Sequence, residues 1–130
     1  MDRQQQVDYW LNSAIHDLET AESLYKAGKY DWCLFLGHLV LEKALKAIYA
    51  REHEDELPPR MHNLVRLIRD TSIPADEEMI LWLDRVTDFH LEARYPDYKN
   101  EFFKQCTPEF ADSQLSKIKE FFSWIKSHLK

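Results

Sequence analysis

The segment at residues 30–50, YDWCLFLGHLVLEKALKAIYA, has a helical period and apolar residues on nearly every side. Large aliphatic residues form one stripe of this predicted helix: Leu34, Leu41, Leu45 and Ile48. Smaller residues form a second stripe, along which a neighbouring helix can approach closely: Cys33, Gly37, Val40, Ala44 and Ala47. A helix that is hydrophobic all round belongs in a core or at an oligomer interface.

Three polar residues interrupt this apolar helix. His38, Glu42 and Lys46 follow one another at a spacing of four residues, which places them in one line on the helix surface. Because an unpaired buried charge is costly, the line must be paired internally, face a cleft or lie at an edge. One interpretation is an intrahelical Glu–Lys pair with its charged ends at the solvent edge. The other is a polar cleft between helices that accepts the phosphate or base of a nucleotide.

The remaining hydrophobic pattern predicts further helices and short connections. Gly28 suits the left-handed position after the first helix, so the first two helices should form an antiparallel hairpin. The longest connection, at 95–107, is broken at Pro96 and is expected to be a loop. The pattern thus predicts an all-α, up-and-down bundle of about five helices in one domain, 1–130. The predicted helices lie at 4–27, at 30–50, at 62–69, from about residue 75, and from Thr107.

Composition narrows the possible classes. Gly28 and Gly37 are the two glycines of the chain, too few for the tight turns of a β-sandwich or barrel. No apolar run approaches the ~18 residues that span a bilayer, and the N-terminus lacks a signal-peptide pattern, so we expect a cytoplasmic protein without membrane association. The net charge of −6 argues against electrostatic binding of duplex nucleic acid.

The two cysteines and the six histidines lack the spacing of metal ligands. Cys33 lies on the small-residue stripe and is expected to be a buried apolar residue, with no disulfide to Cys106. We therefore expect neither a metal nor another cofactor.

Arg85 and His90 form an Arg-x4-His pattern, which is used in metal-independent RNA cleavage. There the histidine transfers a proton and the arginine stabilises charge on the phosphate. Five steps of about 100° leave the two side chains about 140° apart on a straight helix. The pair could meet if the helix were distorted or the site were shared across a dimer. Otherwise Arg85 is a surface residue beside Asp84 and Asp88, and His90 lies at the edge of the core.

A second candidate is the motif Arg94–Tyr95–Pro96–Asp97. In structural terms, Arg94 suits the negative end of a helix and Tyr95 can close the bundle. In functional terms, an arginine beside Tyr95 and Tyr98 can hold a phosphate while a base stacks on the rings. The two interpretations are compatible.

Together these motifs resemble the HEPN domain, a helical domain of higher eukaryotes and prokaryotes that is linked to nucleotides and RNA. The resemblance covers roughly residues 7–100, and the combination of E-K-A-L-K-A with downstream H-x-L and R-Y-P-D carries it. The matching residues are Trp10, Ala14, Asp17, Leu18, Ala21, Leu24, Gly28, Tyr30, Gly37, His38, Glu42, Lys43, Ala44, Leu45, Lys46, Ala47, His62, Leu64, Leu67, Ala93, Arg94, Tyr95, Pro96 and Asp97.

The resemblance implies a five-helix bundle that is commonly dimeric and often encoded beside a minimal nucleotidyltransferase, in some cases as a toxin–antitoxin pair. RNA-cleaving members share an Arg-x4-6-His motif whose second residue is usually polar, and here that residue is Val86. The tyrosine found two residues after the histidine in toxins with a nucleotidylating partner is replaced by Glu92. Both departures argue against ribonuclease activity and favour the R-Y-P-D branch.

We therefore predict a homodimeric protein without chemistry of its own that binds a nucleotide or RNA, or a nucleotidyltransferase partner. The candidate binding residues are Glu42, Lys46, His62, Arg94 and Tyr95. One alternative is a metal-independent ribonuclease toxin that uses Arg85 and His90. Another is an interaction scaffold in which every motif is structural.

Overall fold

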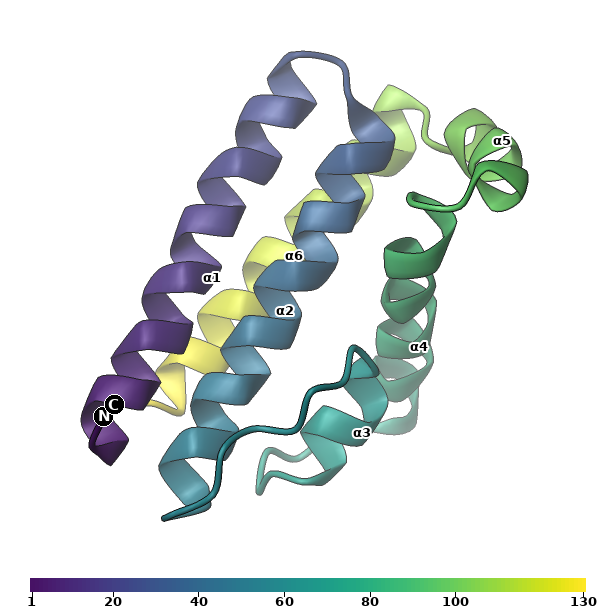
Figure 1. Ribbon diagram of the computed structural model, residues 1–130. Coiled ribbons are helices and arrows are strands. Elements are labelled where there is room, and N and C mark those ends of the chain that lie inside the picture. Colours follow the sequence, from purple (N-terminus) through teal and green to yellow (C-terminus); the bar gives the residue numbers. More distant parts are fainter.

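Helices make up the regular secondary structure of the computed structural model, which describes residues 1–130 except for the side chains of residues 96–100. Figure 1 shows three long helices packed side by side, with α4 beside α2 and the short α3 and α5 near the two ends of α4. This arrangement confirms the predicted all-α bundle. Six helices lie in the described chain: α1 (Arg3–Lys26), α2 (Tyr30–Glu52), α3 (Leu64–Arg69), α4 (Glu77–Glu92), α5 (Pro96–Gln105) and α6 (Pro108–Ser127).

The first two helices form the predicted antiparallel hairpin (Figure 1). Gly28 has a φ of 75°, in the left-handed region that favours glycine, and its backbone amide donates to the carbonyl of Tyr25 at 3.0 Å. Farther along the hairpin, the ammonium of Lys43 lies 2.7 Å from the carboxylate of Asp17 and ties α2 to α1. Ala14 and Ala21 are fully buried on α1 and allow the two helices to lie close together.

On its other side α2 packs against α6, at the small-residue stripe that the sequence predicts. Gly37 lies directly beneath Ile118 of α6: a Cβ added at Gly37 would be 2.6 Å from Cδ1 of that isoleucine. The predicted inward residues of α6 are buried, among them Ile118, Phe122 and Ile125. Both α1 and α6 therefore cover α2, which explains why α2 is apolar on nearly every side.

Side-chain caps fix where three of the later helices begin. Asn63 accepts from the amide of Arg66, Asp76 from that of Met79, and Thr107 from that of Phe110, at 2.8 to 3.1 Å. The cap at Thr107 is as predicted. The fourth helix begins at Glu77, two residues later than the predicted start near Ala75, because the side chain of Asp76 serves as its cap.

The predicted loop at 95–107 is wrong, since most of it is α5, and the bundle has six helices in the described chain instead of about five. Pro96 does not break a helix here. It occupies the first turn of α5, where a proline has no hydrogen bond to lose and its φ suits the helix. Phe102 anchors this helix: it is 1% exposed, and its ring centroid lies 5.4 Å from that of Phe89 on α4.

Within the described residues, none of the helices has both the length and the apolar composition needed to cross a membrane.

The contact between Gly37 and Ile118 predicts a graded response to substitution. Gly37→Ala should change the free energy of unfolding by less than about 1 kcal/mol, because the Ile118 methyl end can rotate away and alanine favours a helix. Gly37→Leu should destabilise the protein by about 1 to 3 kcal/mol, since the space beneath α6 is filled. Urea denaturation measures both effects. Adding Ile118→Val removes the obstructing methyl and should make Gly37→Ala stabilising; additive effects in this double-mutant cycle would contradict the contact.

Candidate functional site

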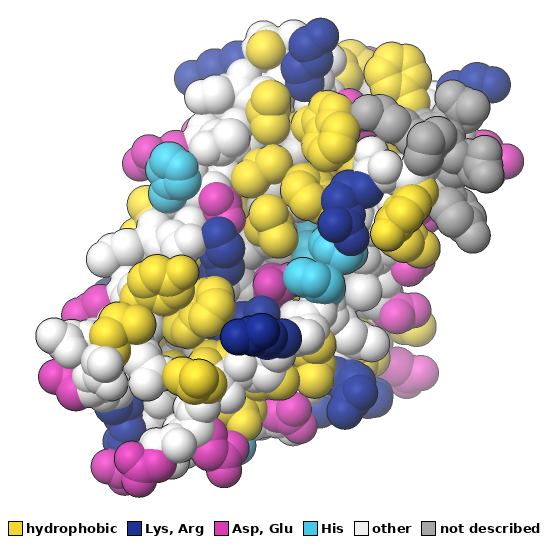
Figure 2. Space-filling view, in the orientation of Figure 1, with side chains coloured by type: hydrophobic (Ala, Val, Ile, Leu, Met, Phe, Trp, Pro, Cys, Tyr) yellow, Lys and Arg dark blue, Asp and Glu magenta, His cyan; other side chains and the backbone are white. Residues whose placement is uncertain are grey.

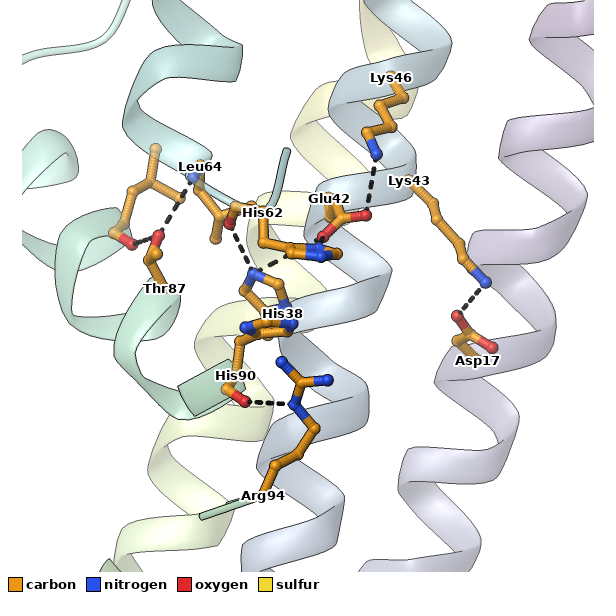
Figure 3. A network of polar contacts seen from close by, with 11 residues as sticks. Asp17, His38, Glu42, Lys43, Lys46, His62, Leu64, Thr87, His90 and Arg94 are labelled. Atoms are coloured by element: carbon orange, nitrogen blue, oxygen red, sulfur yellow. Dashed lines mark hydrogen bonds and ion pairs between the residues drawn. The ribbon is translucent and has the colours of Figure 1, made fainter. Parts of the chain in front are cut away.

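Glu42, in the middle of α2, is the centre of a buried polar network (Figure 3). It is 4% exposed, and each of its carboxylate oxygens has a partner. Lys46 donates from Nζ to Oε2 at 3.0 Å, and His62, from the connection between α2 and α3, donates from Nδ1 to Oε1 at 2.6 Å. The carboxylate thus joins one turn of α2 to a segment twenty residues away in the sequence.

These partners keep Glu42 ionised although it is buried. Burial by itself raises the pKa of the Glu42 carboxyl, because it disfavours the charged form. The hydrogen bond from His62 and the positive charge of Lys46 outweigh burial, so the pKa lies below its ordinary value. The predicted Glu–Lys pair therefore exists, but its charged ends do not lie at the solvent edge, since Lys46 is only 6% exposed.

His38 lies one turn before Glu42 and fixes the same connection by its backbone. Its Nε2 is 2.9 Å from the carbonyl of His62; a carbonyl can only accept, so Nε2 carries the proton. The other nitrogen, Nδ1, is buried and has no hydrogen-bond partner among the described residues. Burial of this fully enclosed ring lowers the pKa of His38, which therefore stays neutral at pH 7.

His90 of α4 adds a third imidazole. Its ring centroid lies 4.0 Å from that of His62, at an interplanar angle of 25°, and 5.0 Å from that of His38. On the other side it stacks on Phe35 of α2 at 5.9 Å. Burial, followed by the neighbouring histidines and Arg94, lowers the pKa of His90 to about 4. The cluster thus gathers side chains from α2, the α2–α3 connection and α4.

Arg94 closes the cluster at the surface. It follows α4 directly and donates from Nε to the carbonyl of His90 at 3.2 Å. Its guanidinium lies 5.9 Å from the ring centroid of Phe35 and 5.7 Å from that of Tyr95. Figure 3 shows the guanidinium directed toward the rings of His38 and His90. Among the described residues no carboxylate pairs with it, so its remaining N–H groups are available to an anion.

The five predicted binding residues divide into two layers. His62, with 52% of its side chain exposed, lies at the surface with Arg94 and Tyr95. Glu42 and Lys46 lie beneath, with the ammonium of Lys46 also 5.3 Å from the ring of Trp10 on α1. Of the other residues proposed for this motif, Pro96, Asp97 and Tyr98 have side chains outside the described part of the chain.

The predicted catalytic pair is not brought together within one chain. The guanidinium of Arg85 donates to Glu92 at 3.1 Å and to Gln105 of α5 at 2.9 Å, and it lies over the ring of Phe89. His90 points to the opposite side, toward α2, as expected for five steps along the undistorted α4.

Sequence reasoning did not connect His90 with Arg94, nor Phe35 with either. The spacing contains the signal, because residues four apart lie on one face of a helix. His90 and Arg94 are four apart at the end of α4, and Phe35 precedes His38 by three residues on α2.

Donor chemistry also bears on metal binding. Although the three imidazoles are close together, no group of three or more His, Cys, Asp or Glu side chains in the described part of the chain is arranged to hold a metal ion. Two of the candidate donors are already committed, since Nε2 of His38 and Nδ1 of His62 carry protons that they donate.

The family model for the HEPN domain matches residues 7–128, almost the whole chain. The chain belongs to the HEPN domain family. In the search of solved structures, the HEPN chain resembles TT1696 from Thermus thermophilus, with a TM-score of 0.80 and 20% sequence identity over 98% of each chain. At this identity the likeness concerns the fold alone. The comparison with curated protein sequences found no match.

Several residues that carried the resemblance to the HEPN domain hold its elements together. Asp17 pairs with Lys43 across the hairpin, Glu42 binds His62, and Leu64 is buried at the start of α3. The amide of Leu64 also donates to Oγ1 of Thr87 at 3.1 Å, which ties α3 to α4. These motif positions therefore fix the frame in which Arg94 and the histidines are held.

The low pKa of His90 predicts a pH-dependent stability. Between pH 7 and 5 the unfolded chain protonates this imidazole near its ordinary pKa of 6.5, whereas the folded protein, with a pKa of about 4, does not. The unfolded state thus binds more protons, and stability falls as the pH falls. We expect His90 to contribute about 1 kcal/mol to this loss after allowance for its partial exposure. Urea denaturation at pH 7 and 5 measures it.

The matched comparison uses His90→Asn and His16→Asn. The first should reduce the loss of stability between pH 7 and 5, whereas substitution of the exposed His16 should leave it unchanged. An unaltered pH dependence in His90→Asn would show that the cluster does not hold His90 neutral.

Proposed function

We propose that this HEPN domain binds a nucleotide at the surface formed by Arg94, His62 and Tyr95. The observation that carries the proposal is the exposed guanidinium of Arg94, which has no carboxylate partner among the described residues and lies beside aromatic rings and imidazoles. A cation of this kind attracts a phosphate, and its planar N–H groups match phosphate oxygens.

The same surface offers rings on which a base can stack. Tyr95 is 49% exposed, and its ring is beside the Arg94 guanidinium. The partly exposed rings of Phe35 and His90 lie on the other side of Arg94. Stacking on aromatic side chains contributes about 1 to 3 kcal/mol per base and tolerates different bases. The arrangement supports a nucleotide with its phosphate at Arg94 and its base on these rings.

Glu42 and Lys46 act beneath this surface as positioning residues. Glu42 orients the ring of His62 through Nδ1, which leaves Nε2 of that exposed ring to face a ligand. Lys46 balances the charge of the carboxylate at 3.0 Å. We assign no chemical step to the domain itself; as its resemblance to the R-Y-P-D branch implies, it would serve a minimal nucleotidyltransferase partner, in some settings as one half of a toxin–antitoxin pair.

A metal-independent ribonuclease is the second candidate, and the neutral imidazole of His90 favours it. With a pKa of about 4, His90 is unprotonated at pH 7 and is able to accept a proton. Arg85, in contrast, is held by Glu92 and Gln105, so in one chain a phosphate at His90 would meet Arg94 instead.

Calorimetric titration with ATP tests the nucleotide site. We expect binding to the protein and at least a tenfold loss of affinity in Arg94→Ala, since a charge-assisted hydrogen bond contributes about 1.5 to 3 kcal/mol. Arg69→Ala is the matched control, because Arg69 is exposed on α3 and its loss removes the same charge. Equal affinities for ATP in the two variants would refute the role of Arg94.

We also propose that the protein forms a homodimer through the exposed side of α2. Figure 2 shows a hydrophobic patch over this helix beside the histidine side chains. Phe35, Leu36 and Leu39 of α2 are partly exposed, and Leu91 of α4 is 43% exposed nearby in the fold. A second copy is the favoured occupant, because pairing along this side would bring two Arg94 sites close to one interface.

Sedimentation velocity tests the dimer. The protein should sediment at twice its chain mass of 15.6 kDa, and Leu39→Asp should shift it to the monomer by placing a charge in the apolar interface. Leu81→Asp is the control, since Leu81 is 67% exposed on another part of α4. A monomeric wild-type protein at high concentration, or a dimer that survives Leu39→Asp, would contradict this interface.

A further inference from the structure

A groove lies between the N-terminal half of α4 and the C-terminal half of α6, away from the histidines. It has a volume of about 400 Å³ and is lined on its floor by Met79, Trp82, Phe121 and Trp124. The rings of Trp82 and Phe121 have centroids 5.6 Å apart, and those of Phe121 and Trp124 are 5.7 Å apart. The three rings thus form a continuous aromatic strip across the two helices.

The strip is held in a fixed conformation. The indole nitrogen of Trp82 donates to Oε1 of Gln114 on α6 at 3.0 Å, and Gln114 is itself 9% exposed. At the other end Trp124 contacts His128 edge to face, with ring centroids 4.9 Å apart. A site whose rings are already ordered loses little conformational entropy when a ligand binds.

The rim of the groove is acidic. Asp76, Glu78 and Glu120 line it, against the single ammonium of Lys117. Asp76 caps α4, whereas Glu78 and Glu120 are exposed and make no side-chain hydrogen bond or ion pair with any described residue. Aromatic faces attract cations, and unpaired carboxylates attract them further.

We propose that this groove, hereafter the acidic groove, binds an amphipathic basic segment of a partner protein. An apolar side chain of the segment rests on Trp82 and Phe121, while a lysine or arginine reaches the carboxylates of Glu78 and Glu120. The charge of the rim selects this occupant: an acidic or nucleic-acid ligand would be repelled, and a purely apolar one would leave the carboxylates unpaired. The inference does not depend on the nucleotide site.

The test uses a synthetic helical peptide of leucine and lysine, about 18 residues long so that it forms several helical turns, with a second peptide in which glutamate replaces lysine. The four tryptophans of the protein give separate indole N–H signals in ¹H–¹⁵N NMR spectra, which single Trp→Phe variants assign. The lysine peptide should shift the signals of Trp82 and Trp124 and leave those of Trp10 and Trp32 in place. The glutamate peptide should shift none of them.

The double variant Glu78→Lys/Glu120→Lys reverses the charge of the acidic groove without touching its aromatic floor. It should weaken binding of the lysine peptide at least tenfold, as followed by the Trp82 signal. The control Glu19→Lys/Glu101→Lys makes the same change in net charge at two other exposed carboxylates and should alter the affinity less than twofold.

Three results would overturn the proposal: shifts centred on Trp10 or Trp32, equal weakening by the two double variants, or no shift of Trp82 and Trp124 at millimolar peptide. Signals of Trp82 and Trp124 that move with protein concentration in the absence of peptide would also overturn it, because they would show that a second copy of the chain occupies the groove.

Discussion

The buried carboxylate of Glu42 is the constraint on which the rest of the structure depends. An ion of this size inside a protein costs several kcal/mol unless its charge and its lone pairs are compensated. Lys46 supplies the charge and a hydrogen bond from the same helix, but the second oxygen needs a donor from elsewhere in the chain. His62 supplies it, so the connection after α2 has to turn back across this helix.

The position of His62 determines the geometry of the surface above it. With Nδ1 held by Glu42 and its carbonyl held by His38, the imidazole is fixed at both ends and presents one face to His90. His90 in turn lies at the end of α4, where its carbonyl accepts from Arg94. A charge buried in α2 is thus linked, through successive contacts, to the orientation of an exposed guanidinium on another helix.

The sequence contained most of the fold but only part of this site. Helix periods, caps and Gly28 are local signals, and the polar line in α2 had to be paired because burial of charge is costly. The partner of Glu42 was not predictable in this way, since its contact with His62 depends on the path of a connection that has no period. Pro96 is an ambiguous signal because one residue type both ends and begins helices. The Arg85–His90 motif pairs residues on different faces of α4, whereas Arg94 shares a face with His90.

The opposite ends of α4 carry opposite charge, and the helix dipole accounts for both. Glu77 and Glu78 lie in its first turn, where the positive end of the dipole stabilises carboxylates, and Arg94 follows its last turn, where the negative end stabilises a cation. Sixteen residues separate the ends by about 24 Å, well beyond the screening length of about 8 Å at physiological ionic strength. An anion at Arg94 and a cation in the acidic groove can therefore bind the same helix without electrostatic interference, each at the end that the dipole already favours.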